Sequence, residues 1–332
     1  MSDDSVYYSF IIPTLASRPN IFKIIDSIQN SGLENYEIIV SYYNRDKYSD
    51  KDIILKLQGI NNNKIRIVNS KIGSSGGNRN SGSSAARGAY LCFVDDDVTL
   101  DNSLFLYLKN NKLQEKCIYF PEIKNEIYVP YPLGDHVSGK SYVSACFVIS
   151  KKTFMEIGYM NEKLNAYRDD SEFFIRATKM GIDLLFMESV YIFHPIRFLK
   201  WKTFSSMFDK QQYEPLFHKL TSGNYNRVIK KGLISTTANR YGFSIIFYYA
   251  LTISIFIFLL LFFSFVYILV SIILIYILLS IFFTLLFIHF NIKFLNNKLL
   301  KLFSRISITA ILWPLYFVAR VVGSIKYKHF TI

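Results

Sequence analysis

Tyr90-Leu91-Cys92-Phe93-Val94-Asp95-Asp96-Asp97-Val98 joins an apolar run directly to three carboxylates. The β-branched and aromatic residues of the run predict a buried strand. Three adjacent acids at its carboxyl end repel one another unless a cation or a set of hydrogen-bond donors gathers there. A Mg²⁺ or Mn²⁺ ion holding a diphosphate meets this need, since such ions combine one or two carboxylates with phosphate oxygens. The alternative is an acidic corner solvated by water, because ordinary turns also use Asp.

The chain on either side of this stretch alternates between predicted strands and predicted helices. The further strands are expected at residues 8–12, 36–42, 64–68, 142–150 and 184–193, and the helices at 20–30, 53–57, 80–88, 152–157 and 171–180. Such alternation implies a parallel sheet with crossover helices, in which ligands bind beyond the carboxyl ends of the strands. We therefore expect Pro13-Thr14, Tyr43-Asn44 and Asp95 to Asp97 to converge at one edge of the sheet.

A glycine-rich stretch, residues 73–82, precedes the acidic strand. Gly77 and Gly82 have the spacing of a P-loop, but Ser83 stands where the phosphate-binding Lys must be. No GxGxxG motif follows the first predicted strand, so the dinucleotide-binding fingerprint is missing as well. A flexible linker is the alternative interpretation of this stretch.

A second acidic cluster, Asp169-Asp170, stands at the amino end of the predicted helix 171–180. The helix dipole favours anions there and keeps a carboxylate ionised, as a general base requires. Ordinary helix N-capping accounts equally well for one of the two. His194 ends the predicted strand 184–193, and a single His is either a ligand or a structural residue.

Residues 243–290 contain no Asp, Glu, Lys or Arg, and two membrane helices of roughly 20 residues each fit into this length. We expect a transmembrane hairpin that turns near residues 264–271. The next apolar piece, residues 306–319, is short for a span and lies between Arg305 and Arg320. An interfacial helix within residues 302–325 is the prediction, and a tilted third span is the alternative.

The net charge of +13 comes largely from cations that flank the apolar segment. They are Arg227, Lys230, Lys231 and Arg240 before it, and Lys293, Lys298, Lys301 and Arg305 after it. By the positive-inside rule both ends of the hairpin face the cytoplasm. Anionic membrane lipids explain this basicity better than nucleic acid does. The start of the chain has no signal-peptide pattern, and three scattered cysteines predict reduced core residues.

In combination, these motifs resemble glycosyltransferase family 2 over roughly residues 8–194. The family's features occur in order: Pro13-Thr14 at the end of the opening strand, Arg79-Asn80-Ser81-Gly82, Phe93-x-Asp95-x-Asp97, and Asp169-Asp170 followed by Glu172 and Arg176. The resemblance implies an α/β GT-A catalytic domain, Rossmann-like, with a mixed sheet flanked by helices. We assign residues 1–200 to this cytoplasmic domain, 201–242 to connecting amphipathic helices, 243–290 to the transmembrane hairpin and 302–325 to the interfacial or third helix.

The resemblance also implies roles for individual residues. Asp95 would contact the ribose, Asp97 would bind Mg²⁺ or Mn²⁺ at the diphosphate of a nucleotide sugar, and Asp170 would be the general base. His194 would assist at the metal. Further nucleotide-sugar contacts would come from Pro13, Thr14, Asn44, Gly77, Arg79 and Asp96, and support for the acceptor site from Asp169, Glu172 and Arg176. The implied reaction is a single in-line displacement with inversion at the anomeric carbon.

Two departures from the family pattern matter. Residues 41–46 read Ser-Tyr-Tyr-Asn-Arg-Asp where many members have Asp-Asp-Gly-Ser, so the identity of the base stays open. The Gln-x-x-Arg-Trp motif of processive synthases is not matched by residues 197–201, which indicates that one sugar is added. The membrane anchor favours a polyprenyl-linked or other lipid-linked acceptor, because it confines enzyme and acceptor to one surface. The alternative is an inactive scaffold or a sugar-nucleotide sensor with the same fold.

Overall fold

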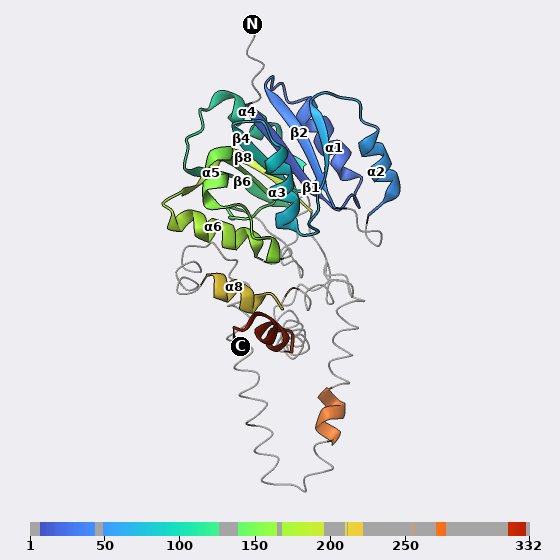
Figure 1. Ribbon diagram of the computed structural model, residues 1–332, viewed down its shortest axis with the longest axis vertical. Coiled ribbons are helices and arrows are strands. Elements are labelled where there is room, and N and C mark those ends of the chain that lie inside the picture. Colours follow the sequence, from blue (N-terminus) through green and yellow to red (C-terminus); the bar gives the residue numbers. More distant parts are fainter. Residues whose placement is uncertain are drawn as a thin grey trace, which may run out of the picture. The chain divides into compact units, whose positions relative to one another are not determined.

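The computed structural model describes residues 7–43, 49–125, 139–164, 168–195, 210, 212–221, 254, 270–276 and 318–329. The chain divides into two compact units, which are described separately. The first comprises Met1–Arg197 and Leu216–Ile234, and the second Phe198–Pro215 and Ser235–Ile332. An eight-stranded sheet forms the centre of the first unit (Figure 1).

The sheet is mixed, with the strand order β3-β2-β1-β4-β7-β6-β8-β5. The strands are β1 Tyr8–Thr14, β2 Tyr36–Tyr42, β3 Ile65–Asn69, β4 Tyr90–Val94, β5 Thr99–Leu100, β6 Cys117–Asn125, β7 Cys146–Ser150 and β8 Asp183–His194. Strands β1 to β4 run parallel, whereas β7 is antiparallel to both of its neighbours, β4 and β6. The mixed sheet implied by the resemblance is therefore confirmed. The parallel arrangement implied by the alternation of strands and helices is found among β3, β2, β1 and β4.

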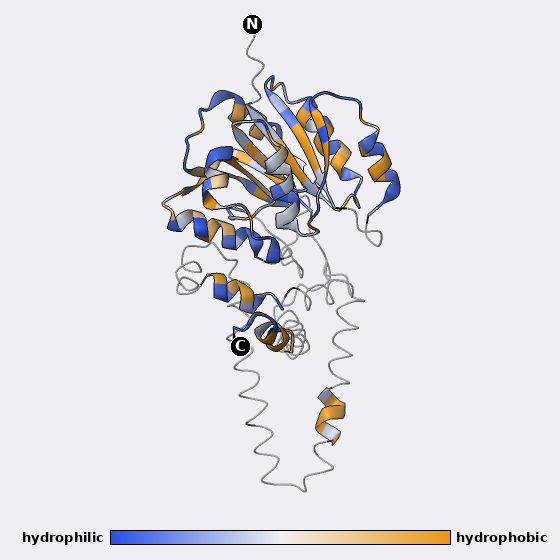
Figure 2. Ribbon diagram, in the orientation of Figure 1, coloured by the Kyte–Doolittle hydropathy of each residue, from blue (hydrophilic) through white to orange (hydrophobic). Residues whose placement is uncertain are grey.

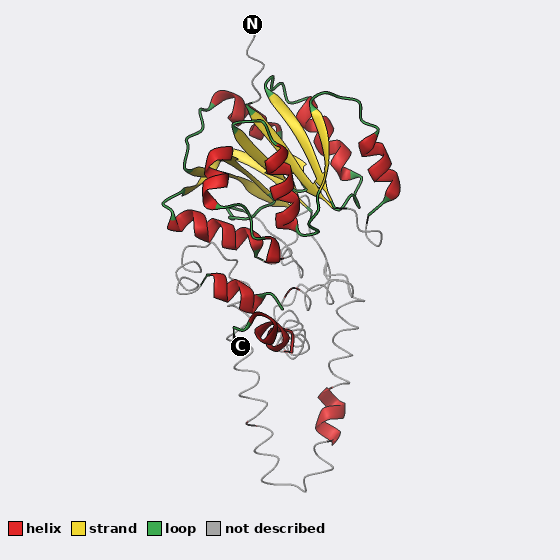
Figure 3. Cartoon of the chain, in the orientation of Figure 1, coloured by secondary structure: helices red, strands yellow, loops and turns green. Residues whose placement is uncertain are grey.

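Helices cover both faces of the sheet (Figure 3). They are α1 Asn20–Gln29, α2 Lys51–Gln58, α3 Ser75–Ala85, α4 Asn102–Asn110, α5 Lys151–Ile157 and α6 Asp169–Lys179, with a short 3₁₀ helix at Glu162–Leu164. The apolar faces of α1, α2 and α4 share one core cluster with residues of the central strands. Helix α3 packs against β1 and β2 and also contacts α6. Helix α8, Glu214–Leu220, follows later in the chain.

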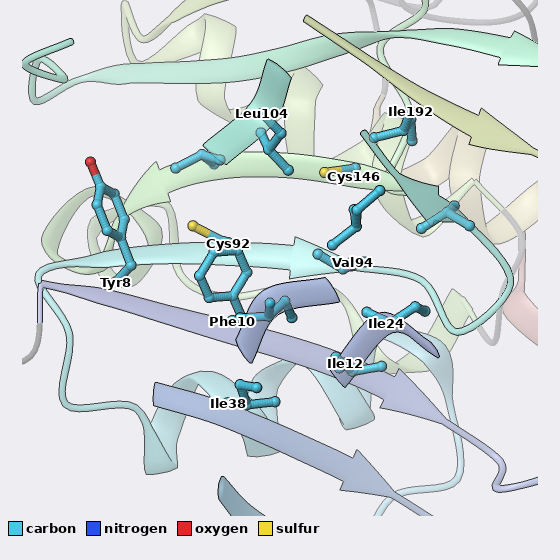
Figure 4. Packing of buried hydrophobic residues seen from close by; sticks show 14 of the residues in the cluster. Tyr8, Phe10, Ile12, Ile24, Ile38, Cys92, Val94, Leu104, Cys146 and Ile192 are labelled. Carbon is cyan, nitrogen blue, oxygen red and sulfur yellow. The ribbon is translucent and has the colours of Figure 1, made fainter. Parts of the chain in front are cut away.

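Alternating residues of the central strands enter the two cores on opposite faces of the sheet. Phe10 of β1 and Cys92 of β4 belong to the cluster shown in Figure 4, whereas Phe93 stacks on Phe147 and contacts Phe154. Because helices cover both faces, the central strands β1 and β4 are buried along their whole length, and Figure 2 shows many apolar residues, in orange, in the strands of the sheet. All three cysteines are buried free thiols, as predicted, and burial raises the pKa of Cys92.

The glycine-rich stretch is the first part of a helix, not a linker. Helix α3 begins at Ser75, five residues before the predicted start, because Ser74 caps it by accepting a hydrogen bond from the Gly77 amide at 3.0 Å. A Cβ on Gly77 would lie 2.7 Å from the Ile72 side chain, so close packing requires glycine there. This observation explains Gly77 without any nucleotide contact.

Other elements also differ from the prediction. Helix α6 begins at Asp169 and not at Ser171, so both acids lie in its first turn. Strand β7 begins at Cys146, after the predicted start at residue 142. Helix α4 and strands β5 and β6 lie in the region for which the sequence indicated no element.

Most of the predicted membrane segment, residues 243–290, lies outside the described residues, as do residues 302–317 of the last predicted helix. Among the described residues, no helix is long and apolar enough to cross a membrane.

Candidate active site

The carboxyl ends of β1 and β4 meet, as predicted, at the acidic loop. Thr14, the last residue of β1, donates a hydrogen bond from Oγ1 to Asp96 Oδ2 at 2.6 Å. The same Thr14 hydroxyl accepts from the Ala16 amide at 2.8 Å, and the Asn78 side chain donates to the Thr14 carbonyl at 3.0 Å. Pro13 is buried within β1, in register with Ser41 of β2, so its part in the site is to shape this strand end. Asn44 lies outside the described residues.

Arg18, in the loop between β1 and α1, bridges two of the three acids. Its Nη1 atom lies 2.7 Å from Asp96 Oδ1 and 2.9 Å from Asp97 Oδ2. The two carboxylates are largely buried, at 11% and 7% side-chain exposure, whereas Arg18 is 42% exposed. Arg18 was not among the residues predicted for the site, because the path of a loop, not a residue pattern, brings it onto the acids.

Asp97 and His194 come together from the ends of β4 and β8. Asp97 Oδ1 lies 3.8 Å from His194 Nε2, and His194 Nδ1 contacts the Pro195 carbonyl at 3.0 Å. A carbonyl at Nδ1 is the usual way in which a protein orients an imidazole so that Nε2 can bind a metal. No group of three His, Cys, Asp or Glu side chains with metal-binding geometry occurs among the described residues. Two protein ligands completed by phosphate oxygens suit Mg²⁺ or Mn²⁺, so the donor set fits such an ion.

Arg79 of α3 links the acidic loop to the acidic pair of α6. Its buried guanidinium pairs with Asp95, and its Nη1 atom lies 3.7 Å from Asp169 Oδ2 and 3.1 Å from Ser75 Oγ. Burial alone would lower the pKa of Arg79, but the facing carboxylates more than offset it and the pKa is raised. Desolvation raises the pKa of Asp95 to about 6 in spite of this arginine.

The two members of the acidic pair have different surroundings. Asp169 is buried, and its Oδ2 atom accepts a hydrogen bond from Ser75. Asp170 is half-buried and accepts from the Ser144 amide at 3.2 Å and the Ser171 amide at 2.7 Å. Burial, and then the neighbouring Asp169 carboxylate, raise the pKa of Asp170. The alternative in which one Asp is the N-cap is wrong, because Arg168 is the N-cap residue and makes no side-chain cap hydrogen bond.

Glu172 and Arg176 brace the connection between α5 and α6. Arg176 donates to both carboxylate oxygens of Glu172, at 2.7 and 2.9 Å, and to the backbone carbonyls of Ile157 and Tyr159. Gly158 between these carbonyls has φ +90°, a conformation that favours glycine. Both side chains therefore hold α6, and with it the acidic pair, in place.

Replacement of Arg79 tests the link that this residue makes between Asp95 of the acidic loop and Asp169 of α6. We expect Arg79→Leu to lower the free energy of unfolding by about 3–5 kcal/mol, since removing one partner leaves buried charges uncompensated. The measurement is denaturant unfolding of the purified chain. Lys152→Leu, which removes a cation from the exposed pair with Glu115, should leave the midpoint where it is. An unchanged midpoint in Arg79→Leu would show that the arginine does not hold the site together.

One family model matches part of the domain that carries this site. Residues 9–132 match Glycosyl transferase family 2. The predicted enzyme class, a glycosyltransferase, is confirmed by this match. The matched region contains Thr14, Arg79 and the acidic loop and ends before the acidic pair and His194. The contacts of Arg79 with Asp169 and of Asp97 with His194 join the later residues to it.

Several solved structures are similar to this chain. Staphylococcus aureus TarS 1-349 in complex with UDP-GlcNAc aligns with 16% identity and a TM-score of 0.48, over 72% of this chain and 76% of that one. GalNAc-T7 with UDP, GalNAc and Mn²⁺ aligns with 14% identity and a TM-score of 0.44, over 65% and 50%. The catalytic domain of Drosophila beta1,4galactosyltransferase 7 with xylobiose gives 13% and 0.37, over 56% and 66%. No curated protein sequence matches the chain significantly.

Proposed function

We propose that this protein is a metal-dependent inverting glycosyltransferase that moves one sugar from a nucleotide-sugar donor to a lipid-linked acceptor at the cytoplasmic face of a membrane. The observation that carries the proposal is the charge at the carboxyl edge of the sheet. Five carboxylates gather there, and Arg18 and Arg79 form ion pairs with four of them, those of Asp95, Asp96, Asp97 and Asp169. This excess of negative charge favours a divalent cation and disfavours a diphosphate that arrives without one.

Asp97 and His194 would hold the cation, and Asp95 and Arg79 would shape the neighbouring nucleotide site. When bound, the metal would stabilise the negative charge that develops on the leaving nucleoside diphosphate. Thr14 fixes the orientation of Asp96 through its 2.6 Å hydrogen bond, so the acidic loop is arranged before any ligand arrives.

Asp170 is the proposed base. It is more exposed than Asp169, and its raised pKa brings it nearer to the pH at which a base is most effective. Asp169, held by Ser75 and Arg79, acts as the positioning residue for the first turn of α6. In this arrangement one carboxylate takes the proton of the acceptor hydroxyl while the other keeps the turn rigid.

The membrane location rests on the charge-free residues 243–290 and on two described segments. Residues 270–276 are helical, and Val270, Ile273, Leu274 and Ile275 are each at least 50% exposed. In residues 318–329 the exposed apolar side chains Val318, Val322 and Ile325 recur at the spacing of one helix face. Exposed apolar rows of this kind suit lipid better than water, and the second row supports an interfacial helix.

The proposed topology can be tested directly. The amino terminus and residues 291–305, which lie outside the described residues, should both face the cytoplasm. A cysteine introduced at Lys298 should resist an impermeant thiol reagent in intact cells and react after permeabilisation. Reaction from outside intact cells would contradict the hairpin.

The reaction itself separates an enzyme from a scaffold or sensor of the same fold. Purified membranes that contain the protein should release nucleoside diphosphate from one nucleotide sugar only when Mg²⁺ or Mn²⁺ is present. The donor can be found by a thermal-shift screen of the solubilised protein against nucleotide sugars with and without Mn²⁺, because a ligand that binds the folded state stabilises it. Binding without release of the diphosphate would favour the sensor.

A further inference from the structure

Arg18 occupies the position that a cation would take between Asp96 and Asp97. A single nitrogen, Nη1, lies within 3 Å of one oxygen of each carboxylate, at 2.7 and 2.9 Å. Asp97 is also the residue that, with His194, fits the metal. The Asp97 carboxylate would therefore have two cationic partners, the Arg18 guanidinium and the metal ion. Two cations bound to the same carboxylate repel each other.

The guanidinium can leave while the loop keeps its path, because the backbone on either side of Arg18 is anchored separately. The Ala16 amide donates to Thr14 Oγ1 at 2.8 Å, and the Ala16 carbonyl accepts from the Asp50 amide at 2.9 Å. After it, Asn20 donates to the carbonyls of Asp96 and Val98. The Arg18 side chain, 42% exposed, lies on the solvent side of the buried acids.

We propose that Arg18 is the counter-cation of Asp96 and Asp97 in the donor-free enzyme, and that a divalent cation displaces it. The proposal rests on the metal assigned to Asp97 in the proposed function. Once displaced, the guanidinium stays tethered at the rim of the site, where it pairs with the diphosphate of the donor. Arginine suits this role because its planar fork binds phosphate oxygens in pairs.

This exchange has two consequences of opposite sign. Before the donor arrives, Arg18 competes with the metal and weakens its binding. After the donor arrives, Arg18 adds a contact to the diphosphate and strengthens donor binding. The enzyme would therefore hold metal weakly when empty and bind metal and donor cooperatively, a coupling for which 5–150-fold is typical.

Arg18→Gln separates these effects. Calorimetry on the full-length detergent-solubilised chain should show Mn²⁺ alone binding about tenfold more tightly to Arg18→Gln than to the wild type. UDP, used as the diphosphate probe at saturating Mn²⁺, should bind about tenfold more weakly. Lys152→Gln removes one positive charge from an exposed pair with Glu115 and should change neither affinity. Opposite shifts are the signature, because a misfolded variant would lose both affinities.

An unchanged or weaker Mn²⁺ affinity in Arg18→Gln would overturn the proposal, and so would an unchanged UDP affinity. Asp97→Asn keeps this result distinct from the proposed function. Loss of Mn²⁺ binding in that variant supports the metal site whatever Arg18 does, and retention refutes the metal site itself.

A measurement on the wild type covers the case in which Arg18→Gln does not fold. The rate at which phenylglyoxal modifies Arg18, followed by peptide mapping, should rise when Mn²⁺ is added and fall again when UDP follows. A rate that does not respond to Mn²⁺ would refute displacement.

Discussion

Asp170→Asn should keep the affinity for the donor and lower turnover by roughly 10²–10⁴-fold, the usual contribution of a positioned general base. The amide has nearly the shape of the carboxylate and can keep one of the two hydrogen bonds that separate Asp170 oxygens accept from the Ser144 and Ser171 amides. It cannot accept the proton of an acceptor hydroxyl. Single-turnover kinetics together with donor titration would show binding that survives while chemistry fails.

The loss of turnover at acidic pH gives a second test of Asp170 as the base. A base must be ionised to act, and the pKa of Asp170 is raised above the ordinary value of 3.8 by burial and by Asp169. As the pH falls, Asp170 should therefore become protonated, and turnover should fall, at a higher pH than it would with an Asp of ordinary pKa. This pH dependence should disappear in Asp170→Asn.

Asp169→Asn is the matched control, since the two acids are adjacent and only one is assigned the chemistry. We expect a milder loss of turnover, because Asp169 acts through Ser75 and Arg79 on the position of the turn. The base would have to be reassigned if Asp169→Asn lowered turnover more than Asp170→Asn. The same holds if Asp170→Asn weakened donor binding and preserved turnover.

The strands that are buried on both faces of the sheet could be predicted, because such burial requires long apolar runs in the sequence. Strand β2 was predicted with its observed limits because all seven of its residues are buried, and β4 because an apolar run ends at three acids. Strand β6 was missed, since Pro121 and Lys124 interrupt its apolar run and no alternation results. Helix α4 follows β5 within a few residues, which leaves no composition change to separate them.

The candidate site was predictable as far as chain order and strand ends determine it. The convergence of Thr14 with the acidic loop follows from parallel strands whose carboxyl ends share an edge. Arg18 and Ser75 were not predictable in this way. Ser75 meets Asp169 across 94 residues of sequence through the packing of α3 against α6, and no local pattern encodes such a contact.

Asp97→Ala should abolish metal-dependent nucleotide binding and leave the fold intact. The carboxylate is the proposed ligand that orients the ion toward the diphosphate, and His194 alone offers one nitrogen. The fold should survive because the variant leaves Arg18 paired with Asp96 at 2.7 Å, so no buried cation is stranded. Thermal shift of the solubilised chain with UDP, measured with and without Mn²⁺, tests both halves of this expectation.

Asp26→Ala is the control for Asp97→Ala, since it removes an exposed carboxylate from α1 and should leave the Mn²⁺ dependence unchanged. Nucleotide binding that persists in Asp97→Ala with unchanged Mn²⁺ dependence would remove Asp97 from the metal site. A collapse of the unfolding temperature without any ligand would mean that the carboxylate serves the fold. Arg79 is buried between carboxylates, so its replacement should lower the free energy of unfolding. Asp97 pairs with Arg18, which is half-exposed and also pairs with Asp96, so the replacement of Asp97 should weaken ligand binding instead.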